Sequence, residues 1–122
     1  MSTCVLWIDK ENAKIFKLSA SGMDKKEMKH HDVPPIGAHH DNHKQNAEDK
    51  FYHDVATAIG HVEELLIMGP GVAKTHFKHH LEKHNHNELL GKVVGLETLD
   101  SVTDNQVLEA SRKFFKKSHL FN

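Results

Sequence analysis

Three short apolar runs limit most strongly what this chain can fold into. They are residues Cys4–Ile8, Leu65–Met68 and Val93–Leu96, and a polar or glycine-containing segment follows each of them. Runs this short are typical of buried strands, because a buried helix needs roughly ten residues or more. Segments with the apolar spacing of helices lie between and after them. The alternation predicts an α/β fold in which helices pack on a sheet.

A β-hairpin is predicted at the start of the chain. The polar residues Asp9–Asn12 follow the first apolar run, and Ala13–Leu18 then alternate between the two faces of a second strand. Residues Met23–His31 are more polar. They are predicted to form a third strand at the edge of the sheet, where charged side chains are tolerated.

Helices are predicted over about residues 47–60, 72–84 and 103–117. Phe51, Val55 and Ile59 recur at the spacing of a helical face, and Thr103 or Asp104 is a suitable cap for the last helix. Residues 85–91 are predicted to form a polar turn. The resulting order, β-β-β-α-β-α-β-α, predicts a mixed sheet whose strand–helix–strand units are parallel with right-handed crossovers.

The composition is unusual in its 13 histidines, beside 16 basic and 17 acidic side chains and a formal net charge of -1. The near-neutral net charge gives no sign of a constitutive basic field for nucleic acid. The single cysteine, Cys4, excludes an internal disulfide and a cysteine-based zinc cage. No apolar segment approaches the roughly 18 residues of a membrane span, and no secretion signal is visible. We therefore expect one cytoplasmic domain over residues 1–122, with its core at about 4–116 and no membrane partner.

Residues 33–46 show no periodicity and contain Pro34, Pro35 and Gly37. We expect a flexible, histidine-rich loop here, because structureless segments of this length are usually functional or disordered. The candidate binding residues of the loop are Gly37, His39, His40 and His43.

Imidazole groups near this loop and on the second predicted helix are candidate ligands for Zn²⁺, Ni²⁺ or Cu²⁺. On the helix, His76, His80 and His84 are spaced four residues apart and share a face. The spacings match no established metal motif, so a solvated loop and an amphipathic helix with a polar flank are the alternative interpretations. The candidate ligands are His30, His31, His39, His40, His43, His76, His80 and His84.

The tripeptide Gly69-Pro70-Gly71 ends the second apolar run, and Lys74 lies on the first turn of the helix that follows. Glycines in this position can bring backbone N–H groups close to a phosphate at a helix N-terminus. The spacing is neither that of a P-loop nor that of a dinucleotide-binding turn. A tight strand-to-helix turn is therefore the alternative to a phosphate-binding site.

Four stretches match one known domain in order and spacing, and they are Val5–Leu18, Phe51–Ala56, Glu64–Phe77 and Lys92–Thr98. They resemble the opening hairpin, the first helix, the strand–Gly-Pro-Gly–helix unit and the next strand of the central domain of eukaryotic and archaeal release factors, a domain shared with Pelota. The histidine-rich loop and residues 97–115 also resemble bacterial stand-alone homologues labelled translational machinery proteins.

The resemblance implies an RNase H-like fold and a role in translation. The release-factor domain carries Gly-Gly-Gln in the loop before its first helix, whereas residues 34–46 here contain a glutamine but no Gly-Gly. Asp9 alone cannot hold the two metal ions of an RNase H-like nuclease. We therefore expect no enzyme but a translation- or ribosome-associated binding module, with the ribosome or RNA as its partner. A histidine-rich metal-binding protein and a structural, homo-oligomeric stress protein are the alternatives.

Overall fold

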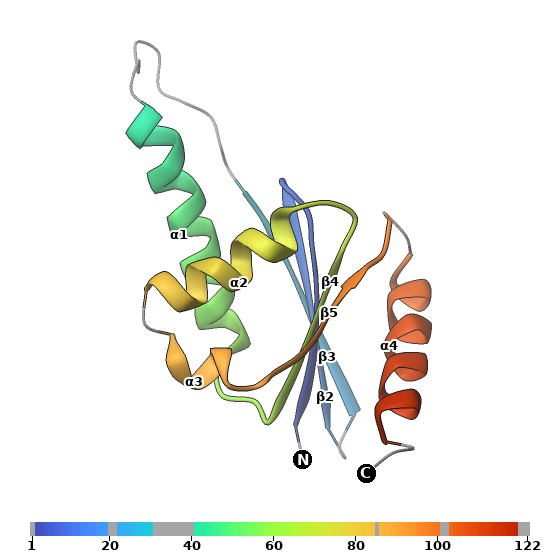
Figure 1. The fold of residues 1–122 in the computed structure, drawn as a ribbon. Helices are drawn as coiled ribbons and strands as arrows, with labels where there is room; N and C mark the ends of the chain where they lie inside the picture. Colours follow the sequence, from blue (N-terminus) through green and yellow to red (C-terminus); the bar gives the residue numbers. More distant parts are fainter. Residues whose placement is uncertain (1, 20–21, 31–40, 85, 101–102, 120–122) are drawn as a thin grey trace.

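A computed structural model describes residues 2–19, 22–30, 41–84, 86–100 and 103–119. Within these ranges lie five strands and four helices (Figure 1). They are β1 (Thr3–Ile8), β2 (Asn12–Ser19), β3 (Gly22–Lys29), α1 (Asp41–Ile59), β4 (Glu64–Gly69), α2 (Ala73–Lys83), α3 (Asn87–Leu90), β5 (Val93–Thr98) and α4 (Asp104–His119). None of the helices in the described ranges has both the length and the apolar character needed to cross a membrane.

The strands form one mixed sheet in the order β3-β2-β1-β4-β5. The pairs β1–β2 and β2–β3 are antiparallel, whereas β1–β4 and β4–β5 are parallel. Asp9 closes the first hairpin, because its Oδ1 accepts hydrogen bonds from the backbone N–H groups of Glu11 (2.9 Å) and Asn12 (2.6 Å). The architecture confirms the predicted α/β class, a mixed sheet with helices packed on it.

Helices cover both faces of the sheet, with α1, α2 and α3 on one face and α4 on the other (Figure 1). Along β1, Cys4, Leu6 and Ile8 belong to the core beneath α1 and α2, while Val5 and Trp7 belong to the core beneath α4. A strand covered on both faces needs apolar residues at every position, which explains the unbroken apolar run. Burial also raises the pKa of the Cys4 thiol to about 12, so the thiol remains protonated at neutral pH.

The third strand lies at the edge of the sheet, as its polar sequence predicted. Most side chains of β3 are exposed, and Lys25 pairs with Glu27 on the same strand (2.7 Å). Charges on an edge strand discourage pairing with a further chain. The polar composition of β3 is therefore explained by its position in the sheet.

A capping box fixes the start of α4 and confirms the predicted cap. The backbone N–H of Thr103 donates to Gln106 Oε1 (2.9 Å), and the backbone N–H of Gln106 donates to Thr103 Oγ1 (3.3 Å). The next residue, Asp104, forms ion pairs with Lys14 of β2 (3.3 Å) and with Lys25 of β3. These pairs connect the first turn of α4 to two strands.

The ion pairs of Asp104 predict a pH-dependent contribution to stability. The hydrogen bond from Lys25 lowers the pKa of Asp104 below its ordinary value of 3.8, and Lys14 acts in the same direction. A carboxylate with a lowered pKa stabilises the fold above its ordinary pKa, and this contribution is lost as the pH falls through the lowered pKa. We expect Asp104→Asn to lower Tm by a few degrees at pH 7 and to have no effect in strong acid.

Thermal unfolding of the variant and the wild type at both pH values checks this expectation. The effect should shrink with added salt, because the Asp104 side chain is 38% exposed. Glu109→Gln is the matched control, since it breaks an exposed pair with Arg112 on the same helix and should leave Tm nearly unchanged. A difference between Asp104→Asn and the wild type that persists in strong acid would contradict the ion-pair explanation.

Two sequence predictions need correction at the level of element boundaries. The predicted loop over residues 33–46 ends earlier, because α1 begins at Asp41 rather than near Ala47. The added turns are polar, and a helical stretch without an apolar face cannot be distinguished from a loop by periodicity. The rest of the predicted loop, residues 33–40, lies outside the described residues. The predicted polar turn at residues 85–91 contains α3, whose four residues are too few for a periodic signal.

Candidate functional site

Four histidines and an aspartate gather where α1 packs against the end of α2. Asp49 and His53 lie one turn apart on α1, His80 lies on α2, and His84 and His86 lie in the segment between α2 and α3. The ring centroids are 4.4 Å apart for His80 and His84 and 5.6 Å apart for His80 and His86. The rings of His53 and His86 are also 5.6 Å apart. We call these five residues the histidine cluster.

His80 is the buried centre of the histidine cluster, with only 4% of its surface exposed. Tyr52 of α1 packs edge-on against its ring, with centroids 5.6 Å apart. The Nδ1 of His80 lies 3.4 Å from Asp49 Oδ1, and the Nε2 of His84 lies 3.7 Å from the same oxygen. Among the residues that the structure describes, neither ring nitrogen of His80 has a hydrogen-bond partner. A buried polar group without a partner is uncommon and costly, so this imidazole requires an explanation.

The surroundings favour the neutral form of two imidazoles of the histidine cluster, those of His80 and His86. Burial lowers the pKa of His80, the neighbouring His84 lowers it further, and Asp49 acts in the opposite direction. Burial likewise lowers the pKa of His86, with added effects from His53 and His84. A neutral imidazole offers a nitrogen lone pair, which is the form that binds a metal ion.

Three side chains of the histidine cluster have the spacing of metal ligands. One ligand atom from each of Asp49, His80 and His84 lies within 4.8 Å of the others. In the part of the chain that the structure describes, no other set of histidine, cysteine and acidic residues meets this spacing. The arrangement can therefore supply two imidazole nitrogens and one carboxylate oxygen to a single ion.

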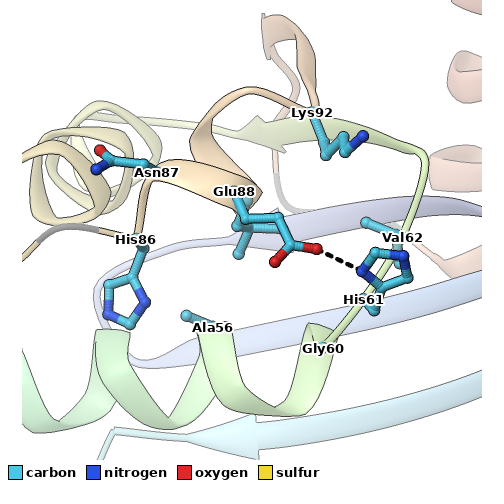
Figure 2. A pocket seen from close by; sticks show the side chains of 9 residues that line it. Ala56, Gly60, His61, Val62, His86, Asn87, Glu88 and Lys92 are labelled. Carbon is cyan, nitrogen blue, oxygen red and sulfur yellow. Dashed lines mark hydrogen bonds and ion pairs between the residues drawn. The ribbon is translucent and has the colours of Figure 1, made fainter.

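A pocket of about 320 Å³ lies beside the histidine cluster, between the end of α1 and α3. Figure 2 shows Glu88 facing His61 on one side of it and His86 on the other. The Nδ1 of His61 lies 2.5 Å from Glu88 Oε1. This contact connects the turn after α1 to α3. His86 contributes to both the pocket and the histidine cluster, so the two features are continuous.

The Gly-Pro-Gly turn forms a second depression of about 390 Å³ together with the hairpin turn at Asp9. Gly69 is the last residue of β4 and lies against the backbone of Ile8. Lys74 is only 8% exposed, and its Nζ donates to the carbonyl oxygen of Gly71 at 2.5 Å. The ammonium group is thus held within the turn. The geometry favours the tight strand-to-helix turn over a phosphate site that depends on Lys74.

The structure brings together only part of the predicted metal-ligand set. His80 and His84 meet, whereas His76 is exposed and belongs to no such group. His30 stacks on Phe51 with ring centroids 4.9 Å apart, and its Nδ1 lies 3.2 Å from the carbonyl oxygen of Lys10. Gly37, His31, His39 and His40 lie outside the described residues. His43 lies in the first turns of α1, and its side chain is not among those described.

Sequence reasoning missed Asp49, His53 and His86. A weak signal was present, because Asp49 and His53 are four residues apart on a predicted helix and must share a face. Their contact with α2 depends on how the two helices pack, and spacing along the chain does not specify that packing.

The fold is one shared with translation termination factors. No protein-family model matches the sequence, and no curated protein matches it. Among solved structures, Archaeoglobus fulgidus Pelota matches with a TM-score of 0.65 and 19% identity over 92% of this chain and 31% of that chain. The archaeal translation termination factor aRF1 matches with a TM-score of 0.61 and 14% identity over 98% of this chain and 40% of that one.

A third solved structure is Dom34 of S. cerevisiae, a translation termination-like factor involved in RNA quality control pathways and interacting with Hbs1. It matches with a TM-score of 0.52 and 10% identity over 78% of this chain and 28% of that chain. The chain thus spans less than half the length of each of these proteins. The predicted resemblance to release factors and Pelota is confirmed at the level of the fold.

Proposed function

We propose that this chain is a non-catalytic binding module of translation, which acts in the cytoplasm on the ribosome or on ribosome-associated RNA. The observation that carries the proposal is the shared fold, which extends over 92% of the chain in the comparison with Pelota. The sequence supports it independently, because the matching hairpin, helix and Gly-Pro-Gly unit occur in the same order as in the release-factor domain. A fold alone does not define an activity, so the ribosome is proposed as the partner on both grounds together.

The absence of catalysis is proposed from the sequence that follows β3 and includes the first turns of α1. Residues 34–46 contain no Gly-Gly-Gln, the tripeptide that the resemblance associates with peptide release. Asp9, at the end of β1, uses its Oδ1 to accept two backbone hydrogen bonds of the hairpin turn. That role is structural and gives Asp9 a reason to be present other than metal-dependent cleavage.

Sedimentation with ribosomes tests the proposed partner. Untagged protein is mixed with purified ribosomes and centrifuged through a sucrose cushion, with a chelator selective for transition metals present to prevent bridging through the histidines. We expect the protein in the ribosomal pellet, in an amount that saturates as its concentration rises. Protein that stays in the supernatant at every ribosome concentration would contradict the proposal.

A peptide-release assay tests the proposed lack of catalysis. Ribosomes that carry peptidyl-tRNA are incubated with this protein, and an authentic release factor serves as the positive control. We expect no release of peptide above background, because the Gly-Gly-Gln tripeptide is absent. Stoichiometric release would show that another residue performs this function and would overturn the non-catalytic assignment while leaving ribosome binding intact.

A further inference from the structure

We propose that Asp49, His80 and His84 form a binding site for a first-row transition-metal dication, with Zn²⁺ as the reference ion. The site lies at the contact between α1 and α2, on the face of the sheet that those helices cover (Figure 1). The inference rests on the geometry of these three side chains and is independent of the proposed role in translation.

The distances between the ligand atoms are close to those that a metal requires. Zinc bonds of about 2.0–2.2 Å place neighbouring ligand atoms of a tetrahedral site about 3.3 Å apart. Asp49 Oδ1 lies 3.4 Å from His80 Nδ1 and 3.7 Å from His84 Nε2, and all three ligand atoms lie within 4.8 Å of one another. Closure of the set therefore needs a movement of about 1 Å or less for each ligand atom, which rotation of the 40% exposed His84 side chain can supply.

His80 supplies the second, independent observation. Its side chain is 96% buried, and neither of its ring nitrogens has a hydrogen-bond partner among the described side chains and backbone groups. Buried polar atoms are nearly always satisfied, and a bound ion would satisfy the nitrogen that faces Asp49. Tyr52 packs against the ring of His80, so this imidazole is already positioned for a metal ion before the ion binds.

The chemistry of the ligands favours a transition metal over Mg²⁺ or Ca²⁺. Imidazole suits zinc, copper and nickel, whereas magnesium and calcium prefer sites made entirely of oxygen ligands. Side chains four residues apart at a helix end can face one ion, and His80 of α2 and His84 at its C-cap have this spacing. Three protein ligands leave a fourth position for water or for the nearby His86, whose ring centroid is 5.6 Å from that of His80.

Titration of untagged, chelator-stripped protein with Zn²⁺ by isothermal calorimetry tests the site. We expect one tight site per chain in the wild type and the visible absorption of tetrahedral Co²⁺ when cobalt replaces zinc. Asp49→Asn and His84→Gln should each weaken the tight site by at least about 100-fold, since loss of an outer-shell partner alone weakens metal binding by about 10–100-fold. Zn²⁺ should raise the Tm of the wild type and not that of either variant.

Three controls separate this site from the general affinity of histidines for metals. His76→Gln and His79→Gln change exposed histidines of the same helix and should leave the tight site unchanged. A variant with His39, His40 and His43 all changed to glutamine should keep it as well. His80→Gln is interpreted only when its circular dichroism matches the wild type, so the two partly exposed ligands carry the test.

Three results would overturn the proposal. They are a wild type without a tight site, Asp49→Asn and His84→Gln variants that bind as the wild type does, and a loss of the site when His39, His40 and His43 are changed.

Discussion

Gly69→Ala is expected to destabilise the protein by about 3 kcal/mol, the upper end of the usual cost of overpacking. A Cβ at this position would clash directly with the backbone carbonyl of Ile8 on the adjacent strand. Backbone atoms of a central strand cannot move aside as a flexible side chain can, so β1 and β4 would have to separate locally. Urea unfolding followed by the fluorescence of Trp7, the single tryptophan, measures the loss.

Gly71→Ala is the matched control within the same tripeptide. A Cβ there would meet no atom within 4 Å, and Gly71 does not adopt a positive φ. The change should therefore alter the free energy of unfolding by less than about 0.5 kcal/mol. Equal losses in the two variants would contradict the steric explanation. Weaker binding to ribosomes in Gly71→Ala with unchanged stability would instead restore the Gly-Pro-Gly turn as a binding element.

Phe77→Ala is expected to have a comparable or larger effect, about 3–5 kcal/mol of lost stability. Phe77 is fully buried in the core between α2 and the sheet, and Tyr52 of α1 packs edge-on against it at 6.0 Å. Truncation leaves a cavity between two helices and the sheet, in a protein whose total stability is of the order of 5–15 kcal/mol. The same urea titration measures the change.

Phe115→Ala is the control for the loss of an aromatic ring. Phe115 is half-buried on α4, over the opposite face of the sheet. The Phe115→Ala change removes the same atoms but exposes less of the core. The decrease in the free energy of unfolding should therefore be clearly smaller than for Phe77→Ala. Similar losses in both variants would indicate that α4 contributes as much to the fold as the core beneath α1 and α2.

The sequence predicted the sheet well, because the strands are short apolar runs with recognisable ends. Cys4–Ile8 has no polar residue and is buried on both faces, and the polar β3 lies at the edge, where such a sequence is tolerated. The start of α4 was predicted to within one residue, at Thr103 or Asp104, and the structure places Thr103 in a capping box with Gln106. In each case the signal is local to the element.

The candidate site was predicted only in part, because it depends on contacts between elements. Spacing placed His76, His80 and His84 on one helical face, but it did not indicate which part of that face α1 covers. The structure buries His80 beside Tyr52 and leaves His76 exposed. Asp49 completes the ligand set from a different helix, so no pattern within α2 could have indicated it.

The position of β1 has a consequence for the order in which the chain folds. This strand lies in the middle of the sheet, yet its two partners are at very different distances along the chain. Thr3 of β1 pairs with Leu18 of β2, the other strand of the same hairpin, and also with Glu64 of β4, which is much farther along the chain. The outer partner of β4 is more distant still, since Leu65 pairs with Val93 of β5. The antiparallel strands can associate early, whereas the parallel pairs must first close long loops. During synthesis, one edge of β1 therefore stays open until β4 has left the ribosome, and Val5 and Trp7 stay uncovered until α4, the last helix, follows.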